Sequence, residues 1–366
     1  DIPNRYMSNG YTIWLIFEKD GNEYIVDVKR SSSIKVKLTK NGEDISASYF
    51  HSCNRGKKSI CVDFKTKEGQ DIIKKLVLKA DILIENFKVD GLRKYGLDFA
   101  SLIKINPKLI YCSITGFGQT GPYAHRAGYD YIIQGMSGLM SITGEPSGQP
   151  QKMGVAVTDI LTGLYSVTAI LSAIIQRDKT GKGQQIDMAL LDVATAVTAN
   201  QGMNFLTTGK APQRIGNGHQ NLVPYQVFDC KDGHIIIATG NDAQYQRLCA
   251  ILNLEEIAMN ELFLTNADRL RNRTLLIEKL SCQTTKFLKK DLLEACEKQG
   301  IPAGPINDLS EVFDDPQVVY RGLSKEIDNI PTILSPFRFS DSKMQISKTS
   351  PKLGENTNEI LSSILD

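Results

Sequence analysis

The sequence has almost no excess of charge of either sign. Lys and Arg number 43 and Asp and Glu number 41, so the formal net charge of the 366 residues is +2. This balance excludes a dedicated nucleic-acid binder and a polybasic membrane-surface protein, because both need a strong cationic excess. A site for an anion must therefore be built from a few local cations.

Long apolar runs, cysteine pairs and metal-ligand spacings are also missing. No stretch approaches the ~18 uninterrupted apolar residues of a transmembrane helix, and residues 1–20 lack the features of a signal peptide. The seven cysteines include no Cys-x-x-Cys pair, and the four histidines show no metal-ligand spacing. These absences predict a protein without a metal in a reducing compartment, either the cytoplasm or, in a eukaryote, the mitochondrial matrix. Because the chain begins at Asp1 without a methionine, we expect a truncated or processed form.

The sequence does contain the alternation of short strands and helices that is typical of an α/β protein. Hydrophobic residues make up 41 % of the chain, enough for a large core, and the length suits about two domains. Short apolar strands are predicted at 59–62, 81–84 and 109–114, with an amphipathic helix over 66–80. This order predicts a parallel sheet covered by helices, with ligands bound beyond the carboxyl ends of the strands.

The clearest helical pattern covers residues 158–177. It is expected to start at Thr158 or Asp159 and to stop before Gly181. A short strand at 184–188 and a second helix over 189–206 follow.

The composition changes near residue 208, where a polar, glycine-rich segment begins. Beyond it, Asp232-Gly233 joins two strand-like runs and predicts a tight hairpin, since this pair suits a turn that needs positive φ. Helices are expected at 242–252, 267–280 and 286–298. The predicted organisation is a large Rossmann-like domain at 1–207 with an atypical first ~40 residues, a smaller α+β domain at 220–310, and a segment at 311–366 that returns to the large domain.

Several residues are candidates for chemistry, although each has an ordinary structural explanation. Gly116, Gly118 and Gly121 form a Gly-x-Gly-x-x-Gly pattern after a strand, but no helix is expected at Pro122, so turn glycines explain it better than a dinucleotide site. Asp159 suits a helix N-cap. The same position would also keep its carboxylate ionised and able to act as a nucleophile.

Other candidates lie on predicted turns. Arg55, Lys57 and Lys58 form either a solvated turn or a cluster of cations for a phosphorylated ligand. Asn86 follows a strand, where a turn is usual, and the segment Gly216–Gly218 is typical of a flexible loop.

Taken in order along the chain, these segments resemble the class III CoA-transferases, a family that includes formyl-CoA transferase, carnitine CoA-transferase and α-methylacyl-CoA racemase. The resemblance runs from about residue 45 to the end. The matching stretches are Asn54–Asp63, Ala80–Phe87, Leu109–Pro122, Ala127–Tyr131, Val157–Gly163, Thr180–Asp187 and Gly300–Pro305. Within the family, residues 110–116, 137–144 and 223–226 are most similar to members that use succinyl and glutaryl groups.

The resemblance implies a fold, an assembly and a reaction. It implies ring-like subunits interlocked as a homodimer, and a catalytic aspartate at Asp159 that carries acyl anhydride and CoA thioester intermediates. Backbone N–H groups of Gly216 and Gly218 are candidates to stabilise the oxyanions. Coenzyme A and its thioesters are substrates rather than permanent cofactors, and the implied contacts with CoA are Arg55, Lys57, Lys58, Asn86, Phe87, Lys94 and Tyr129.

Two alternatives follow from departures from the family pattern. In the family, a loop with an Ala-Gly-Pro-like turn near the N-terminus contacts CoA close to its sulfur atom. Residues 1–40 lack this loop, and only a strand at 22–30 is expected there. This departure leaves open the alternative that the chain is an inactive relative. A racemase-type isomerase is the other alternative, but the racemase branch has a histidine where this chain has Tyr129. A tyrosine suits proton transfer at neutral pH less well.

A dicarboxylate substrate needs a cation for its second carboxylate. Arginine is the better choice because its planar fork can donate two hydrogen bonds. Arg214, just before the glycine loop, is the first candidate, with His219 as a secondary donor and Arg126 in reserve. A solvent-facing linker residue is an equally good interpretation of Arg214.

Overall fold

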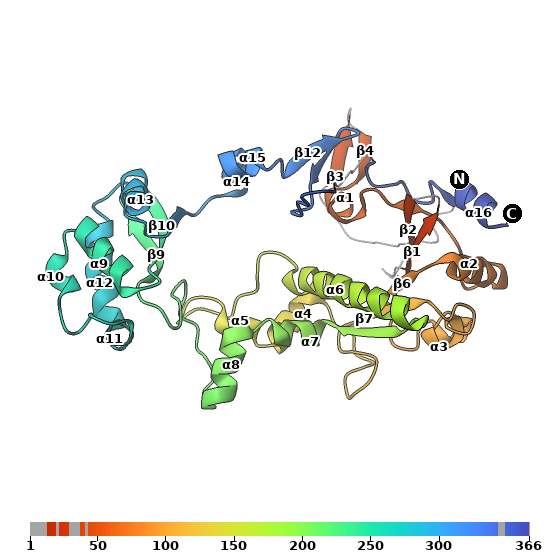
Figure 1. Cartoon of the computed structure of the whole chain (residues 1–366), viewed down its shortest axis with the longest axis horizontal. Helices are drawn as coiled ribbons and strands as arrows, with labels where there is room; N and C mark the ends of the chain where they lie inside the picture. Colours follow the sequence, from red (N-terminus) through yellow and green to blue (C-terminus); the bar gives the residue numbers. More distant parts are fainter. Residues whose placement is uncertain (1–12, 20–21, 29–36, 41–42, 343–347, 366) are drawn as a thin grey trace. The chain divides into compact units, whose positions relative to one another are not determined.

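The computed structural model describes residues 13–19, 22–28, 37–40, 43–342 and 348–365, with side chains for residues 48–342 and 348–363 (Figure 1). The chain divides into two compact units. Unit 1 comprises the chain up to Leu139, Met153–Met203 and the chain from Val319, whereas unit 2 comprises Met140–Lys152 and Asn204–Val318.

Unit 1 is built on a six-stranded sheet with the order β5-β2-β1-β6-β7-β8. Its strands are β1 Ile13–Lys19, β2 Asn22–Val28, β5 Lys58–Ser59, β6 Ile82–Glu85, β7 Ile110–Thr115 and β8 Gln185–Ala189. As predicted, β6, β7 and β8 run parallel. However, β1 is antiparallel to both β2 and β6, so the sheet is mixed rather than the parallel sheet expected. The reason is that β1 and β2 are consecutive strands of one hairpin, and a short connection permits only antiparallel pairing.

The helix predicted over 66–80 is α2, Lys67–Lys79. The Thr66 side chain accepts a hydrogen bond from Gly69 N and caps the helix start. Leu76 and Val77 are buried in the core cluster that covers one face of the sheet. The strand expected at 22–30 is β2, and residues 29–36 lie outside the described part of the chain.

The long helix is α6, Val157–Thr180, and it ends at Gly181 in the left-handed conformation as predicted. Neither Thr158 nor Asp159 is its N-cap, because the cap position falls on Ala156. The first-turn N–H groups are instead satisfied from another element, α4, which is why a local capping rule gave the wrong start.

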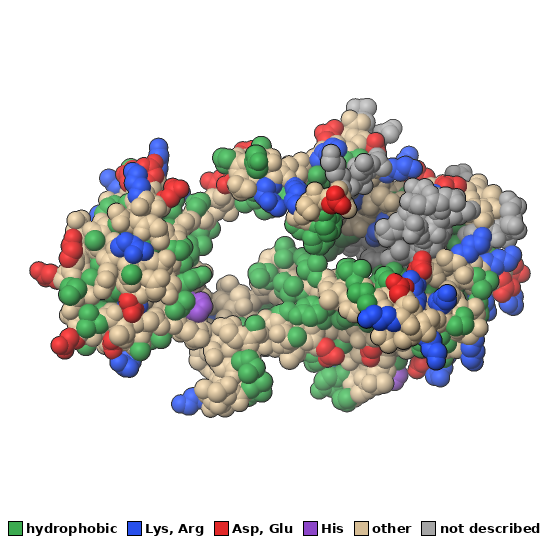
Figure 2. Space-filling model, viewed as in Figure 1, with side chains coloured by type: hydrophobic (Ala, Val, Ile, Leu, Met, Phe, Trp, Pro, Cys, Tyr) green, Lys and Arg blue, Asp and Glu red, His purple; other side chains and the backbone are tan. Residues whose placement is uncertain are grey.

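One face of α6 packs against β7 and β8, and the opposite face is apolar but exposed. Ile170 and Ala173 join the core with Ile110 and Cys112. An apolar stripe on this face of α6 is 52–59 % exposed at Ile160, Leu164, Val167, Leu171 and Ile175, and green side chains gather there in Figure 2. By length and composition α6 is also the one helix in the described residues that could cross a membrane, with 28 % of that window buried.

The second helix expected over 189–206 is two helices, α7 Leu190–Ala196 and α8 Ala199–Thr208. The Thr198 hydroxyl donates to Thr195 O, and Ala199 adopts a φ of 48°. A side chain that bonds its own backbone in this way competes with the helical pattern, so the helix breaks.

The rest of unit 1 consists of short elements. They are β3 Lys37–Lys40, β4 Glu43–Ala47, α1 Ser48–Asn54, a 3-10 turn Arg93–Tyr95, α3 Phe99–Leu102, α4 Asp130–Met136, β12 Ser324–Ile327, β13 Ile330–Ile333 and α16 Thr357–Leu365. The C-terminal segment is tied to β5 and the chain after it: Ser59 N donates to Asn356 Oδ1 and Cys61 N donates to Thr357 Oγ1. α5 Leu139–Ile142 and α15 Pro316–Tyr320 lie where the chain passes between the units.

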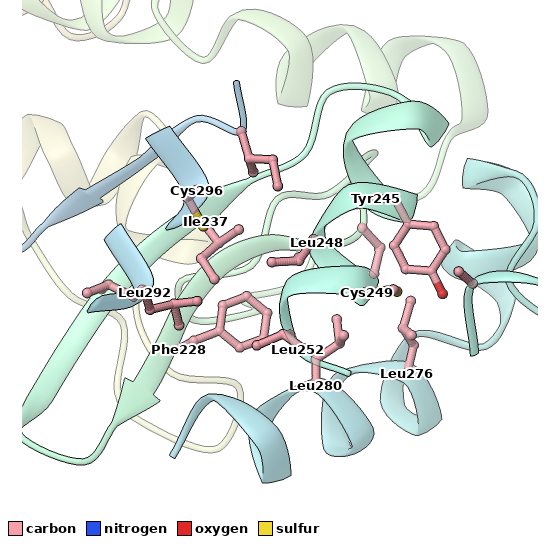
Figure 3. Close-up of a cluster of buried hydrophobic side chains, with 14 of the residues drawn as sticks. Phe228, Ile237, Tyr245, Leu248, Cys249, Leu252, Leu276, Leu280, Leu292 and Cys296 are labelled. Carbon is pink, nitrogen blue, oxygen red and sulfur yellow. The ribbon is translucent and has the colours of Figure 1, made fainter. Parts of the chain in front are cut away.

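Unit 2 contains the predicted hairpin in a three-stranded antiparallel sheet, β11-β10-β9. The elements are β9 Tyr225–Cys230, β10 Gly233–Ala238, α9 Asp242–Ile251, α10 Glu255–Ala258, α11 Asn266–Arg271, α12 Arg273–Thr284, α13 Lys289–Lys298, β11 Ala303–Pro305 and α14 Leu309–Asp314. The helix expected over 267–280 is divided between α11 and α12 at Asn272. Figure 3 shows its core, where Phe228 and Ile237 of the hairpin meet leucines of α9 and α12.

A buried arginine of α11 links separate segments of unit 2. Arg269 is 1 % exposed, and its guanidinium donates to Val223 O and to Asp242 Oδ1, 2.6 Å in each case. It also lies over the ring of Tyr245 at 4.4 Å. A buried cation is tolerated only when paired and hydrogen-bonded, and these contacts meet that requirement.

Two glycines allow the segment after β7 to cross the segment before α4. A Cβ on Gly116 would lie 2.6 Å from Gly128 Cα, and a Cβ on Gly128 would lie 2.7 Å from Gly116 Cα. Both neighbours are backbone atoms, so neither can move aside without shifting a loop.

We therefore expect Gly116→Ala to lower the free energy of unfolding by about 2–3 kcal/mol, the usual cost of overpacking a rigid site. Gly304→Ala is the matched control, because nothing lies within 4 Å of a Cβ at that position. Urea denaturation of both variants measures the difference. Equal stabilities for the two variants would show that the crossing is not close-packed.

Candidate active site

The centre of the site is a carboxylate that joins two helix starts. Asp130 is the first residue of α4, and its Oδ1 accepts hydrogen bonds from Thr158 N at 2.8 Å and from Thr158 Oγ1 at 2.6 Å. Its Oδ2 accepts from Gln134 Nε2 at 2.7 Å. Thr158 is fully buried, so the start of α6 is held rigidly against α4.

Asp159 follows directly, in the first turn of α6. Desolvation, and then the nearby negative charge of Asp130, raise the pKa of its carboxyl to about 6. The side chain is open to solvent, which limits the size of this effect. At neutral pH the carboxylate is ionised but less well stabilised than an ordinary aspartate, which favours reaction as a nucleophile.

The two carboxylates differ in their surroundings. Burial would raise the pKa of Asp130, but the hydrogen bonds from Thr158 and Gln134 outweigh it and the pKa is lowered. Neighbouring carboxyl groups whose pKa values are pushed apart in this way usually have separate roles. Here Asp130 stays ionised and positions the helix, while Asp159 is available for reaction.

Tyr49 of α1 belongs to the same neighbourhood. Burial, then the charges of Cys53, Asp159 and Asp130, raise the pKa of its phenol. Its side chain is 60 % exposed. Neither Tyr49 nor Asp130 was selected from the sequence, since an isolated tyrosine or aspartate has no spacing that signals its tertiary neighbours.

An open position lies one helical turn beyond Asp159. Gly163 is in the interior of α6, and apart from its own helical turns no atom of the described residues lies within 4 Å of the Cβ that another residue would carry. A glycine there costs a helix about 1 kcal/mol relative to alanine, and close packing within the chain does not require it. Gly163 therefore leaves space beside the carboxylate on the same helix face.

The predicted CoA-binding residues Asn86 and Phe87 follow β6, at the carboxyl end of the parallel strands. The preceding residue, Glu85, is 6 % exposed, and its Oε2 accepts from Phe87 N at 2.7 Å. Burial raises the pKa of Glu85 to about 7, against the opposing effect of hydrogen bonds from Phe87 and Ser113. Glu85 thus fixes the turn that carries Asn86, a role that the sequence alone does not reveal.

The predicted cations near this region have local partners. Arg55 donates to Ser52 O at 2.9 Å, and Lys57 donates to Asn54 Oδ1 at 3.0 Å. Lys58 forms an ion pair with Glu359 of α16. Lys94 is exposed in the 3-10 turn, with its ammonium 4.9 Å from the ring centre of Tyr95.

The glycine-rich loop after β7 binds an anion of its own chain. Gln119 N lies 2.9 and 3.1 Å from the two carboxylate oxygens of Asp187, and Gly118 N donates to Thr115 Oγ1. The next helix, α4, starts only at Asp130. The Gly-x-Gly-x-x-Gly pattern is therefore a turn held by an internal carboxylate, without the helix start that a pyrophosphate site needs.

Two further predicted residues flank the start of α4. The guanidinium of Arg126 lies over the ring of Tyr123 at 4.5 Å and near that of Phe117 at 5.5 Å. Tyr129 occupies the N-cap position of α4, and its side chain is 74 % exposed. Tyr129 therefore stands on the surface directly beside Asp130.

The remaining predicted residues gather on one loop of unit 2. Gly216 N donates to Gly144 O at 3.1 Å, and Gly218 N donates to Ile215 O. Arg214 donates from Nε to Glu145 O and from Nη2 to Gly148 O. The ring of His219 lies 5.0 Å from that of Tyr225, and its Nδ1 accepts from Asn221 N. The candidates thus divide between the two units: Asp159 and the predicted CoA-binding residues lie in unit 1, and the residues of the Gly216 loop lie in unit 2.

Comparison with known proteins assigns this arrangement to a class. The family model described as CoA-transferase family III matches residues 32–357. A succinate–glutarate CoA-transferase of Agrobacterium fabrum is 54 % identical over 88 % of this chain and 82 % of its own length. The succinyl-CoA:glutarate CoA-transferase of Homo sapiens is 42 % identical over 87 % of this chain and 74 % of its own.

Solved structures agree. A CAIB/BAIF family protein from Brucella suis matches with a TM-score of 0.80 and 52 % identity, covering 90 % of this chain and 86 % of that one. The protein Rv3272 of Mycobacterium tuberculosis matches with a TM-score of 0.80 and 26 % identity, covering 88 % and 86 % of the two chains. The chain belongs to CoA-transferase family III, as its motifs predicted, and it is a class III CoA-transferase.

The electrostatics of Asp159 predict a pH-dependent change in stability. Its folded-state pKa of about 6 lies above the ordinary 3.8, so the proton stabilises the folded state fully below pH 3.8 and less and less as the pH rises through 6. Asn resembles the protonated form. Asp159→Asn should therefore raise the free energy of unfolding at pH 7–8, by about 1 kcal/mol once solvent exposure is allowed for.

Chemical denaturation at several pH values measures this effect. The difference between Asp159→Asn and the wild type should shrink as the pH falls towards 4. A variant less stable than the wild type at pH 8 would contradict the assigned surroundings of Asp159.

Proposed function

We propose that the chain transfers coenzyme A from succinyl-CoA to a dicarboxylate such as glutarate, with Asp159 as the nucleophile. The observation that carries the proposal is the position of Asp159: an accessible carboxylate with a raised pKa, held beside Asp130 at the start of α6. The names of the relatives that are 42–54 % identical support the choice of acyl groups.

The proposed reaction keeps the acyl group activated at every step. The Asp159 carboxylate attacks the succinyl thioester, giving a succinyl–aspartyl anhydride and CoA thiolate. The thiolate attacks the aspartyl carbonyl, which gives an aspartyl-CoA thioester and releases succinate. Glutarate attacks this thioester to form a new anhydride, and CoA thiolate attacks its glutaryl carbonyl, which forms glutaryl-CoA and restores Asp159. No ATP is needed, because each bond broken is replaced by one of similar reactivity.

The candidate residues of the two units would have different roles. In unit 1, Asn86, Phe87, Lys94, Tyr129 and the cations Arg55, Lys57 and Lys58 would bind CoA. In unit 2, the N–H groups of Gly216 and Gly218 would stabilise the oxyanions. Both N–H groups donate to backbone carbonyls in this structure, so the loop must rearrange before they can face a substrate.

An activity assay tests the proposal directly. Succinyl-CoA is incubated with a panel of dicarboxylates, and the acyl-CoA products are identified by mass spectrometry. We expect glutaryl-CoA from the wild type and a loss of more than about 10³-fold with Asp159→Ala, because Asp159 is the proposed point of covalent attachment. Asp178→Ala, which removes an exposed aspartate near the other end of α6, should keep full activity. An active Asp159→Ala enzyme would overturn the mechanism, and an inactive wild type would favour an inert relative.

We also propose that the enzyme is an interlocked homodimer of ring-like subunits. The support in the chain itself is the exposed stripe of α6, since exposed apolar patches of this kind mark surfaces that another molecule covers. A second copy of the chain is the proposed occupant. All seven cysteines are free, which suits the cytoplasm or the mitochondrial matrix.

Light scattering tests the assembly. The wild type should remain a dimer from micromolar to nanomolar concentration, because interlocked rings must unfold in part to separate. Leu171→Glu places a charge in the stripe and should yield monomer or aggregate. Leu78→Glu is the control, since Leu78 of α2 is similarly exposed at 58 % but lies outside the stripe. A wild-type monomer would contradict the proposal.

A further inference from the structure

A carboxylate is buried at the end of β6, directly before the turn that carries two of the predicted CoA contacts. Glu85 is 6 % exposed, and its partner in register on β7, Ser113, is 1 % exposed. Glu85 Oε2 accepts from Phe87 N at 2.7 Å, and the hydroxyl of Ser113 also stabilises the ionised carboxylate. Gln185 Nε2 of β8 donates in turn to Ser113 Oγ at 3.2 Å. A polar chain thus crosses three neighbouring strands and ends on the turn.

The Glu85 carboxylate has no counter-ion among the side chains that the structure describes. Burial raises its pKa to about 7, although the hydrogen bonds from Phe87 and Ser113 act in the opposite direction. Burying a carboxylate in this way is costly, and a neutral side chain could fill the same volume. What the carboxylate adds is a stronger hydrogen bond to the N–H group of the turn than a neutral acceptor would make.

The position of the turn reaches another predicted CoA contact through three aromatic rings, Phe87, Phe64 and Tyr95, which we call the aromatic cluster. The rings of Phe87 and Phe64 meet edge to face with their centres 5.7 Å apart, and those of Phe64 and Tyr95 meet in the same way at 5.3 Å. The ammonium of Lys94 lies 4.9 Å from the ring centre of Tyr95. Because edge-to-face pairs prefer one geometry, a displaced Phe87 changes the surroundings of Lys94.

We propose that Glu85 is a positioning residue for acyl-CoA: its carboxylate holds the N–H group of Phe87 and so orders the turn, and the aromatic cluster extends this order to Lys94. The inference rests on the proposed binding of CoA by this part of unit 1 and names the residue that arranges the contacts. In this role Glu85 acts through the turn. Its loss should therefore weaken the binding of CoA rather than slow the covalent steps at Asp159.

Calorimetry of CoA binding to the intact enzyme tests this role at pH 8, where Glu85 is ionised. Glu85→Gln keeps the volume but removes the charge, and it should raise the Kd of CoA by about 10-fold, as expected for a lost charged hydrogen bond. Glu85→Asp loses volume but keeps a carboxylate. Because aspartate readily accepts from the N–H group two residues on, its Kd should stay within about 3-fold of the wild type. A role in packing alone would reverse the order of the two variants.

A matched control changes a carboxylate to an amide at the other end of the same strand. Asp81 directly precedes β6 and pairs with Arg177 at 2.7 Å. Asp81→Asn should leave the Kd of CoA unchanged. Kinetics at saturating glutarate should follow the same pattern: Glu85→Gln should raise KM for succinyl-CoA by about 10-fold and change kcat by less than about 3-fold.

A double-mutant cycle tests the link to Lys94. Lys94→Met should weaken CoA binding in the wild type, and by at least about 3-fold less in the Glu85→Gln background, because a misplaced ammonium contributes less to binding. Phe64→Leu interrupts the aromatic cluster without changing Glu85, and it should raise the Kd of CoA by about 2- to 10-fold, the range for a lost aromatic pair.

The outcomes separate this inference from the proposed function. An unchanged Kd in both Glu85→Gln and Phe64→Leu would overturn the inference, and so would an equal loss of affinity in Asp81→Asn. Additive effects of Glu85→Gln and Lys94→Met would overturn the link to Lys94. A wild type that binds CoA, loses affinity in Glu85→Gln and yet forms no acyl-CoA product would instead overturn the proposed function.

Discussion

The hydrogen bonds from Thr158 to the Asp130 carboxylate are the contact on which the proposed catalytic site depends. They join the first turn of α6 to the first turn of α4, so the next residue, Asp159, has a fixed place. They also keep Asp130 ionised. Desolvation, and then this negative charge, raise the pKa of Asp159. The contact therefore fixes the position of the proposed nucleophile and contributes to its reactivity.

That contact depends in turn on close packing of backbone. Asp130 is the first residue of α4, and the close crossing of Gly116 with Gly128 brings the segment before α4 against the segment after β7. The loop between them is held by Asp187 at the neighbouring strand β8. The strand ends, the two glycines and the contact between Asp187 and a backbone amide together support the position of the proposed catalytic carboxylate.

Much of the fold follows from local sequence pattern, and the exceptions have physical causes. Strands β6, β7 and β8, the hairpin at Gly233 and helices α2 and α6 were predicted because burial and turn chemistry act over a few neighbouring residues. The mixed sheet was not predicted, because the pairing of β1 with β6 is a long-range choice. The start of α6 was misplaced for a similar reason: its first-turn N–H groups are satisfied by Asp130, 28 residues away.

The candidate site, like the fold, combines features that local sequence pattern predicts with features that depend on distant parts of the chain. The motifs identified the family and singled out Asp159, whose place at the start of a helix is visible in the pattern. They could not find Glu85, whose role depends on burial, or Asp130, whose role depends on its contact with Thr158, 28 residues away. Burial and contacts between distant residues have no sequence signature, because both are properties of the folded chain.

The central claim is that Asp159 is attached covalently to CoA during the reaction, and peptide mapping tests this claim most directly. The enzyme is mixed with succinyl-CoA, quenched in acid and digested, and its peptides are mapped by mass spectrometry. We predict that the peptide containing Asp159 carries CoA as a thioester, and that this adduct disappears when glutarate is added before the quench. An active enzyme with the adduct on another residue, or with none on Asp159, would contradict the account.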